Sequence, residues 1–444
     1  MKHLRIYKPY KISAVFRLGF IIAVLSMVIA VQSRGQSILS LDSCRSMAFA
    51  YNQDLKVATR GVDAAESSAR ATRANLYPDI DFKSFYLFSD GVNYEVSPSD
   101  LDNIQLYNLG LQISQNIYRG RQVKYSAQIA DQEVDKMNAL RDLSETELIY
   151  YTDQLYWQTV VASEMVVLAR DYTSVIEELY EVVKNRTEAE IIGMNDLLLT
   201  EVQLNDARLE NIKSDNNLKI STMYLNRLIG LDVNSNTVVA SKIIPGVEEQ
   251  EGPERPDAEQ SAMENRPELK AQKAEMDISS TSVDLAKSSY HPALTGSVGG
   301  GFGAMSLSGL EDPGLSVTAL VSLNLPIYEF GQRKHEVAYS RINFEMSELE
   351  YQKLEDIISL EVNSAVYNIE QSRQKVELTY NSLLKARENL GLLTNQYREG
   401  LASVIEVINA QIFWQKAYLS NIQARYQYML DITDYNKAIG LLRG

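Results

Sequence analysis

The sequence predicts a mainly helical protein that also places a β-sheet in a membrane, built from two copies of one structural unit. Three observations support this prediction. Short motifs recur at matched spacings in the two halves, each half contains two segments of alternating polar and apolar residues, and long proline-free stretches follow those segments. Each unit is therefore expected to run in the order helix, strand, strand and long helical hairpin.

The N-terminus has the features of an export signal, which we assign to residues 1–36. These residues hold six lysines and arginines and no acid, and they contain the apolar run from Leu18 to Val31. That run of 14 residues is shorter than the roughly 18 needed to cross a bilayer as a helix. We therefore expect the segment to be removed and the mature protein to have no transmembrane helix.

The charge balance argues against a nucleic-acid partner. The chain has 43 lysines and arginines against 58 acids, a net charge of −15, and this becomes about −21 without the signal.

Cys44 is the only cysteine, so no disulfide can form within the chain. Its position well past the apolar run favours a packed residue over a lipid anchor. No phosphate loop, metal-spaced His/Cys cluster or nucleophile motif is present. We expect no cofactor and no enzymatic activity.

The duplication is the most specific signal in the chain. Three spacings match: Leu55 to Pro78 with Leu269 to Pro292, Ile117 to Asp196 with Ile327 to Glu406, and Asp196 to Gly230 with Glu406 to Gly440. The first repeat is assigned to residues 37–240 and the second to residues 258–444. Prolines, glycines and clustered acids in residues 241–257 indicate an exposed connector.

Each repeat should begin with a helix and continue into two strands. The helices, roughly residues 40–76 and 257–290, end at Pro78 and Pro292, where proline disfavours helix continuation. The strands are expected near residues 79–90, 104–116, 293–304 and 315–325. In the last of these, every odd position is apolar and most even positions are polar, as in a strand with one apolar face.

The remainder of each repeat should be a long helical hairpin. Apolar residues recur every seven positions from Val362 to Tyr397, with small or apolar residues three positions after each, which is typical of a coiled-coil seam. A run of about 65 to 70 residues would span on the order of 100 Å. The hairpins are expected to turn near residues 190–195 and 398–403, close to Gly193 and Gly400.

Four strands pose a physical problem, because they are too few to close a barrel and an open edge is costly in lipid. Three copies would supply twelve strands, which is a permitted size. The fold expected is thus a trimeric 12-stranded β-barrel joined to a long α-helical coiled-coil barrel.

The mature chain resembles the TolC family of outer-membrane efflux proteins. The resemblance rests on Asn52-Gln53-Asp54-Leu55, the corners at Pro78 and Pro292, residues 325–328 with Pro326, and residues 397–407. It implies an outer-membrane exit duct of a tripartite efflux or type I secretion system that extends into the periplasm and passively conducts solutes or proteins. Its partners would be a periplasmic adaptor, an inner-membrane transporter and outer-membrane lipid. The alternative interpretation is a periplasmic coiled-coil adaptor or structural protein of the cell envelope, which leaves the alternating strands without a role.

The resemblance also implies that the two hairpin tips dock the adaptor. The tip residues are Glu190, Gly193, Asp196, Arg398, Glu399 and Gly400. Two positions depart from the family pattern: Glu190 stands where glycine is expected, and Asn116 stands where the second repeat has Pro326. The alternative for each tip charge is that it belongs to a solvated turn.

Glu406 and Asn409 form a candidate gate. They are three residues apart just after the second tip, so they share one face of a helix. A threefold axis would gather three copies of each into rings, and the clustered carboxylates would repel one another and attract cations. The first repeat has Leu199 at the position of Asn409, so only the second hairpin carries both polar residues. An ordinary solvated pair is the competing interpretation.

Overall fold

The computed structural model describes residues 38–90, 103–240, 255–304 and 314–442. The signal peptide assigned to residues 1–36 and the connector up to residue 254 lie outside the described residues. The elements, in chain order, are β1 (Ile38–Leu39), α2 (Leu41–Tyr51), α3 (Gln53–Ala74), β2 (Asp79–Asp90), β3 (Asn103–Arg119), α4 (Gln122–Glu188), α5 (Met194–Ile229), β4 (Val238–Val239), α6 (Arg255–Asn265), α7 (Pro267–Ser288), β5 (Ala293–Ala304), β6 (Gly314–Asn324), α8 (Gln332–Arg398) and α9 (Val404–Ala438).

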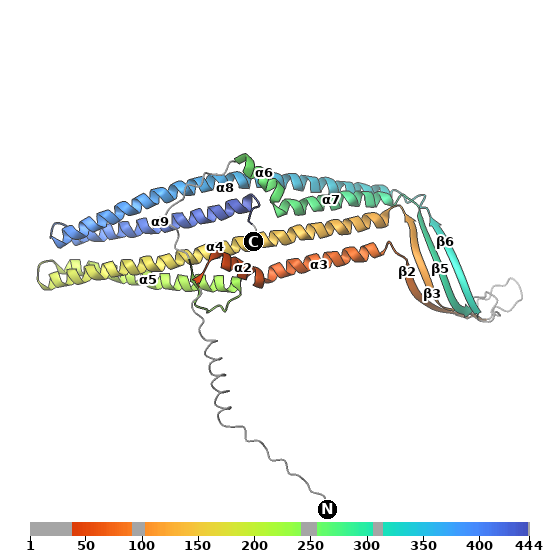
Figure 1. The fold of residues 1–444 in the computed structure, drawn as a ribbon, viewed down its shortest axis with the longest axis horizontal. Helices are drawn as coiled ribbons and strands as arrows, with labels where there is room; N and C mark the ends of the chain where they lie inside the picture. Colours follow the sequence, from red (N-terminus) through yellow and green to blue (C-terminus); the bar gives the residue numbers. More distant parts are fainter. Residues whose placement is uncertain (1–37, 91–102, 241–254, 305–313, 443–444) are drawn as a thin grey trace, which may run out of the picture. The chain divides into compact units, whose positions relative to one another are not determined.

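Four strands, two from each repeat, form one antiparallel sheet in the order β2-β3-β5-β6 (Figure 1). Two strand ends differ from the prediction. β3 continues past Asn116 to Arg119, and its register shifts between Asn116 and Tyr118. β6 ends at Asn324 rather than at residue 325, just before Pro326. Proline has no N–H for the ladder and ends strand pairing, whereas asparagine at the matching position lets β3 run on.

The helix expected at the start of each repeat is in fact two helices. The segment predicted over residues 40–76 is divided at Asn52, and the one predicted over residues 257–290 is divided at Arg266. Asn52 caps α3, its side-chain Oδ1 accepting a hydrogen bond of 2.8 Å from the backbone N–H of Leu55. Pro267 begins α7, which holds the preceding Arg266 in an extended conformation.

Both long hairpins are present. α4 and α8 each have 67 residues, and they are followed by α5 with 36 and α9 with 35. The seam predicted on α8 lies inward, since Val362, Val376 and Tyr397 are all buried. None of the described helices is long and apolar enough to be a candidate for crossing a membrane.

The chain folds into two compact units that do not coincide with the sequence repeats. Among the described residues, unit 1 contains 38–48, 154–240 and 381–426, and unit 2 contains those within 49–153, 255–380 and 427–442. Each unit combines segments of both repeats, because α4, α8 and α9 each contribute to both units. The two sequence repeats therefore do not fold as two separate compact units.

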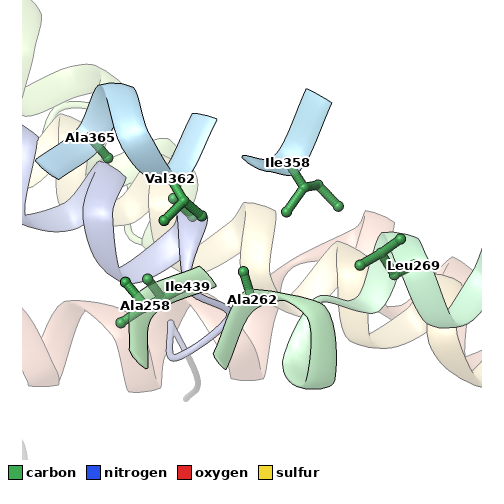
Figure 2. Close-up of a cluster of buried hydrophobic side chains, with 8 residues drawn as sticks. Ala258, Ala262, Leu269, Ile358, Val362, Ala365 and Ile439 are labelled. Carbon is green, nitrogen blue, oxygen red and sulfur yellow. The ribbon is translucent and has the colours of Figure 1, made fainter. Parts of the chain in front are cut away.

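Each unit has its own buried cluster. In unit 2 the short helix α6 packs its small residues, Ala258 and Ala262, against Ile358 and Val362 of α8 (Figure 2). Alanine at these positions allows the helices to approach closely. In unit 1 Leu179 and Val183 of α4 pack with residues of the second hairpin tip.

A two-stranded parallel sheet was not predicted. β1 pairs with β4 through Ile38 with Val238 and Leu39 with Val239. A strand of two residues is too short to show an alternating pattern, so sequence periodicity could not detect it. Asn226, which is fully buried, ties down the loop before β4 by donating to the carbonyl of Ser235 at 2.8 Å.

Candidate functional site

The sheet has one continuous apolar face. Residues that pair directly in an antiparallel sheet project to the same side, so the register assigns every residue to a face. We call the following set the apolar face: Ile80, Phe82 and Tyr86 of β2, Tyr107, Leu109, Leu111 and Ile113 of β3, Leu294, Val298 and Phe302 of β5, and Leu315, Val317, Val321 and Leu323 of β6. Most of these side chains are exposed, and Leu315 is 89% exposed. Such a face is typical of a surface in contact with lipid.

The opposite face is polar and rich in glycine. It carries Asp81, Lys83, Asn108, Gln112, Ser114, Ser297, Ser316, Thr318 and Ser322, with Phe85, Leu87 and Leu320 as apolar exceptions. Gly110 and Gly301 face each other across β3 and β5, and a Cβ on Gly110 would lie 2.5 Å from the carbonyl oxygen of Gly300. The backbones therefore approach closely there, and the polar face is hollowed at that level.

The three prolines predicted at strand–helix corners lie at one end of the sheet. Pro78 precedes β2, Pro292 precedes β5, and Pro326 follows β6. Arg333 stabilises the corner at Pro326. Its guanidinium donates to the carbonyl of Pro326 at 3.1 Å and to Glu329 at 2.7 Å, and it lies 5.6 Å from the ring centre of Tyr290.

The two hairpin tips turn in the same way although their residues differ. At the second tip Gly400 has φ of 81°, and the N–H of Leu401 donates back to the carbonyl of Gln396. At the first tip Glu190 has φ of 56°, and the N–H of Ile191 donates to the carbonyl of Arg186. Both are helix ends closed by a left-handed residue, and glycine is the residue that adopts this conformation without strain. Glu190 thus takes the backbone role of Gly400, whereas Gly193 lies past the turn.

Replacing Glu190 by glycine should stabilise the protein. The left-handed conformation costs a side-chain-bearing residue about 1 kcal/mol, and Glu190→Gly removes that strain. We expect a gain of about 1 kcal/mol in the free energy of unfolding, measured by urea titration of the solubilised protein. The reciprocal change, Gly400→Glu, should cost a similar amount. A loss of stability in Glu190→Gly would show that the carboxylate makes a compensating contact.

Glu406, proposed from the sequence as half of a gate, has a local structural role. Its carboxylate accepts hydrogen bonds from the backbone N–H and the Oγ of Ser403, both at 2.7 Å. The backbone N–H of Glu406 donates in return to the Oγ of Ser403 at 3.4 Å, which completes a capping box at the start of α9. The two bonds that the carboxylate accepts lower the pKa of Glu406. The cap is therefore intact above the ordinary carboxyl pKa and is lost as the pH falls through the lowered value. Serine followed three residues later by glutamate is the sequence signature of such a cap, so this role of Glu406 is readable from its local sequence.

The other predicted gate and tip residues lie at the surface. Asn409 is exposed one helical turn from Glu406, between the buried Ile408 and Ala410. Asp196 is half-buried, and Gly193 begins α5 without a side-chain cap. Arg398, Glu399 and Gly400 are all exposed, as is Glu190. Each tip therefore presents acidic side chains to its surroundings.

Arg186 joins the two tips and was missed in the sequence. From α4 it donates to the backbone carbonyls of Tyr397 at 3.0 Å and Arg398 at 2.9 Å, which closes the C-terminus of α8. Its guanidinium also lies 4.7 Å from the ring centre of Tyr397. Burial raises the pKa of Tyr397, and the nearby guanidinium opposes that shift. Its partners lie more than 200 positions away, so no local pattern could reveal this contact.

The described residues show no grouping that is typical of a metal-binding or catalytic site. Within the described ranges, no group of His, Cys, Asp and Glu side chains could hold a metal ion. Cys44 is fully buried in α2, and burial raises the pKa of its thiol to about 11. Its burial fits the packed residue expected from the sequence.

A sheet with one lipid-like face and one polar face, continued by two long helical hairpins, defines a duct subunit anchored in a membrane. The chain belongs to the outer membrane efflux protein family, whose model matches residues 44–231 and 259–440. The predicted resemblance to the TolC family is confirmed, as is the predicted fold class of long helical hairpins joined to a membrane sheet. The protein is an outer-membrane exit duct for efflux that extends into the periplasm, and members of its family function in tripartite pumps.

The relatives cover most of the chain at low identity. Probable outer membrane lipoprotein SilC of Salmonella typhimurium is 21% identical over 386 residues, covering 86% of this chain and 80% of that protein. Outer membrane protein TolC of Vibrio cholerae is 21% identical over 388 residues, covering 86% of each. The crystal structure of the Campylobacter jejuni CmeC outer membrane channel superposes with a TM-score of 0.80 at 17% identity, covering 90% of this chain and 85% of that chain.

Proposed function

We propose that three copies of this chain share their strands and helices to form one continuous duct, through which solutes leave passively. The observation that carries the proposal is the apolar face of an open sheet. β2 and β6 are its edges, each paired on one side only among the described residues. Exposed apolar side chains and free edges are both costly unless lipid covers the face and another strand pairs with each edge. Three copies supply the twelve strands that satisfy both needs.

Exposed apolar stripes on the helices favour the same assembly. On α8 of unit 2 the side chains Tyr339, Ile342, Met346 and Leu349 recur every three or four residues and are more than half exposed. On α5 of unit 1 Leu198, Val202, Leu209 and Ile212 form a similar stripe. A seam with this spacing is typical of a coiled-coil contact. We propose that a second copy covers these stripes.

The polar face of the sheet would then line the wet passage. The names of two relatives indicate the class of solute. A toluene efflux pump outer membrane protein, TtgC, and an antibiotic efflux pump outer membrane protein, ArpC, both of Pseudomonas putida, are each 21% identical to this chain over 419 residues. We propose that this duct exports small organic solutes handed over by an inner-membrane transporter and a periplasmic adaptor. A deletion strain should accumulate such solutes and become more sensitive to them, and restored export with the intact gene is the required control.

The tips are proposed to dock the adaptor. An open groove of about 700 Å³ in unit 1 is lined by Glu177, Glu178, Glu181, Glu201 and Arg398, among others. The exposed carboxylates Glu190 and Glu399 add to this acidic surface. A basic surface on the adaptor would complement it and speed the encounter.

Cross-linking in cells tests the docking. Cysteines placed at Glu190 and Glu399 should cross-link to the adaptor, whereas a cysteine at Ser316 on the sheet should not. The native Cys44 is buried and should contribute little background. Adaptor cross-links confined to the sheet position would contradict docking at the tips.

Glu406 and Asn409 are proposed to gate the passage. Both side chains are exposed on one face of α9, beside the buried cluster that includes Val407 and Ile408. Three Glu406 carboxylates held together would attract cations and would raise the pKa of at least one of them, opposing the lowering caused by the Ser403 cap.

Conductance in planar bilayers separates a gate from a mere helix cap. Glu406→Gln with Asn409→Ala should abolish block by divalent cations, because position 406 loses its charge and position 409 loses its amide. Ser403→Ala removes the Oγ bonds of the cap but keeps the charge of Glu406, so its block should persist. In the parent, block should weaken as the pH falls and the carboxylates are protonated. Unchanged block in the double variant would refute the gate.

A further inference from the structure

A cavity that has no part in the proposed duct lies beside the α4–α5 hairpin in unit 1. Its volume is about 490 Å³, and its walls come from α4 with Ser163, from α5 with Lys219, and from the segment that leads into β4 with Val238. All three walls belong to unit 1. Pockets of this size, formed where separate elements meet, are typical of small-molecule sites.

Buried hydrogen bonds hold the β4 wall of this cavity in place. Asn226 of α5 is fully buried, and its side chain donates to the carbonyl of Ser235 at 2.8 Å and accepts from the Oγ1 of Thr237 at 2.5 Å. β4 itself pairs with β1, and the N–H of Ala240 donates to the carbonyl of Leu39 at 2.8 Å. The wall is therefore formed before any ligand arrives, which lowers the cost of binding.

The cavity offers a ligand a largely apolar surface. Met223, Val233 and Val238 line it, and each is more than a third exposed. Thr159 and Thr222 line it as well, but their hydroxyls already donate to carbonyls of their own helices. An apolar ligand body would displace water from these side chains, and the flexible thioether of Met223 can adapt to its shape.

The one charge of the cavity that lacks an ion pair is positive. Asp215 and Lys219 are its charged lining residues, one helical turn apart on α5. Arg170 donates to the carboxylate of Asp215 at 3.1 Å, whereas Lys219 makes no ion pair within the described ranges. The side chains of Ser163 and Asn236 also line the cavity and make no hydrogen bond to another described residue. An ammonium and two polar groups are thus available to an anionic group.

We propose that this cavity binds an amphipathic organic anion, with its apolar body against Met223, Val233 and Val238 and its carboxylate or sulfonate paired with Lys219. Charge complementarity decides the class, because the ammonium of Lys219 would repel a cation and a neutral compound would gain nothing from it. A bound ligand would touch α4, α5 and β4 together. The inference rests on neither the membrane sheet nor the hairpin tips, so it is independent of the proposed function.

Calorimetric titration of the full chain tests the site. The protein would be held in phosphatidylcholine nanodiscs and titrated with naphthalenesulfonate, and empty nanodiscs would supply the baseline. We expect saturable binding at one site per chain, and Lys219→Gln should weaken it at least about tenfold because a hydrogen bond from a charged group is lost. Lys213→Gln is the matched control on the same helix. Its lysine pairs with Glu210 at 3.8 Å and lies outside the cavity, so binding should be unchanged.

A neutral ligand and two filled cavities separate charge from shape. Naphthylmethanol has the same rings without the charge, so it should bind the parent and Lys219→Gln alike. Ser163→Phe and, from another wall, Met223→Trp should fill the cavity and abolish binding of both compounds. Urea titration identifies which of these two variants fold like the parent, and either one is sufficient.

Three results would overturn the proposal. The first is a parent that shows no saturable binding, and the second is a folded filled-cavity variant that binds the sulfonate like the parent. The third is a neutral compound that loses as much affinity as the sulfonate in Lys219→Gln, because the ligand would then not be recognised by its charge.

Discussion

Arginine in place of Val321 should prevent the protein from inserting into the outer membrane. Val321 lies on the apolar face of β6 and is 69% exposed, so the charged group would have to enter lipid. Arginine on the lipid face of a membrane strand costs about 2–4 kcal/mol near the bilayer centre, and in the proposed trimer three copies would incur this cost together. We expect the inserted, assembled fraction in outer-membrane preparations to fall by more than about tenfold.

Ser322→Arg is the matched control for this experiment. Ser322 is the next residue of the same strand and pairs with Thr295 on the polar face. An arginine there would face the wet passage and should leave insertion nearly unchanged. If both variants insert like the parent, or if Ser322→Arg is the defective one, the assignment of the two faces is wrong.

The second large effect is expected at Arg266. Its side chain is only 6% exposed and makes ion pairs with Glu268 and with Glu361 of α8. Removing the arginine leaves both carboxylates facing each other without a cation. A fully buried pair broken in this way costs about 3–5 kcal/mol, and we expect about 2–3 kcal/mol here because half of the Glu361 side chain remains exposed.

Urea titration of Arg266→Ala measures this loss, and the duplication supplies its control. Asn52 lies at the matching break in the first repeat and makes one capping bond. Asn52→Ala should therefore cost only about 1 kcal/mol. An Arg266→Ala loss no greater than that of Asn52→Ala would show that the ion pairs contribute nothing beyond an ordinary cap.

Repetition made the fold readable from the sequence. The alternating residues of 315–325 predicted a strand and its apolar face, and the register of β5 with β6 agrees with that assignment. Glu190 is instructive, since its offset from Gly400 equals that of Asp196 from Glu406 and marks it as the turning residue. The left-handed conformation of Glu190 was not predicted, because glutamate does not favour it. The closure of the helix end imposes this conformation on whichever residue stands there.

The features that sequence reasoning missed depend on contacts between distant segments or on very short elements. Arg186 acts on carbonyls of another hairpin, and β1 pairs with β4 over two residues. The break at Arg266 was readable from Pro267, which starts helices far more readily than it continues them. The cap formed by Ser403 and Glu406 was readable as well. The cap gives Glu406 a local structural role, whereas Asn409, the other residue of the proposed gate, has no such role.

Counting the chains in one solubilised particle tests the central proposal most directly. The protein would be extracted from outer membranes in a mild detergent, and its mass would be measured by light scattering with the detergent contribution subtracted. Strand sharing predicts three chains per particle in the parent and a loss of that particle in Val321→Arg. A particle that contains a single chain, stable in detergent and still inserted in the membrane, would contradict the account.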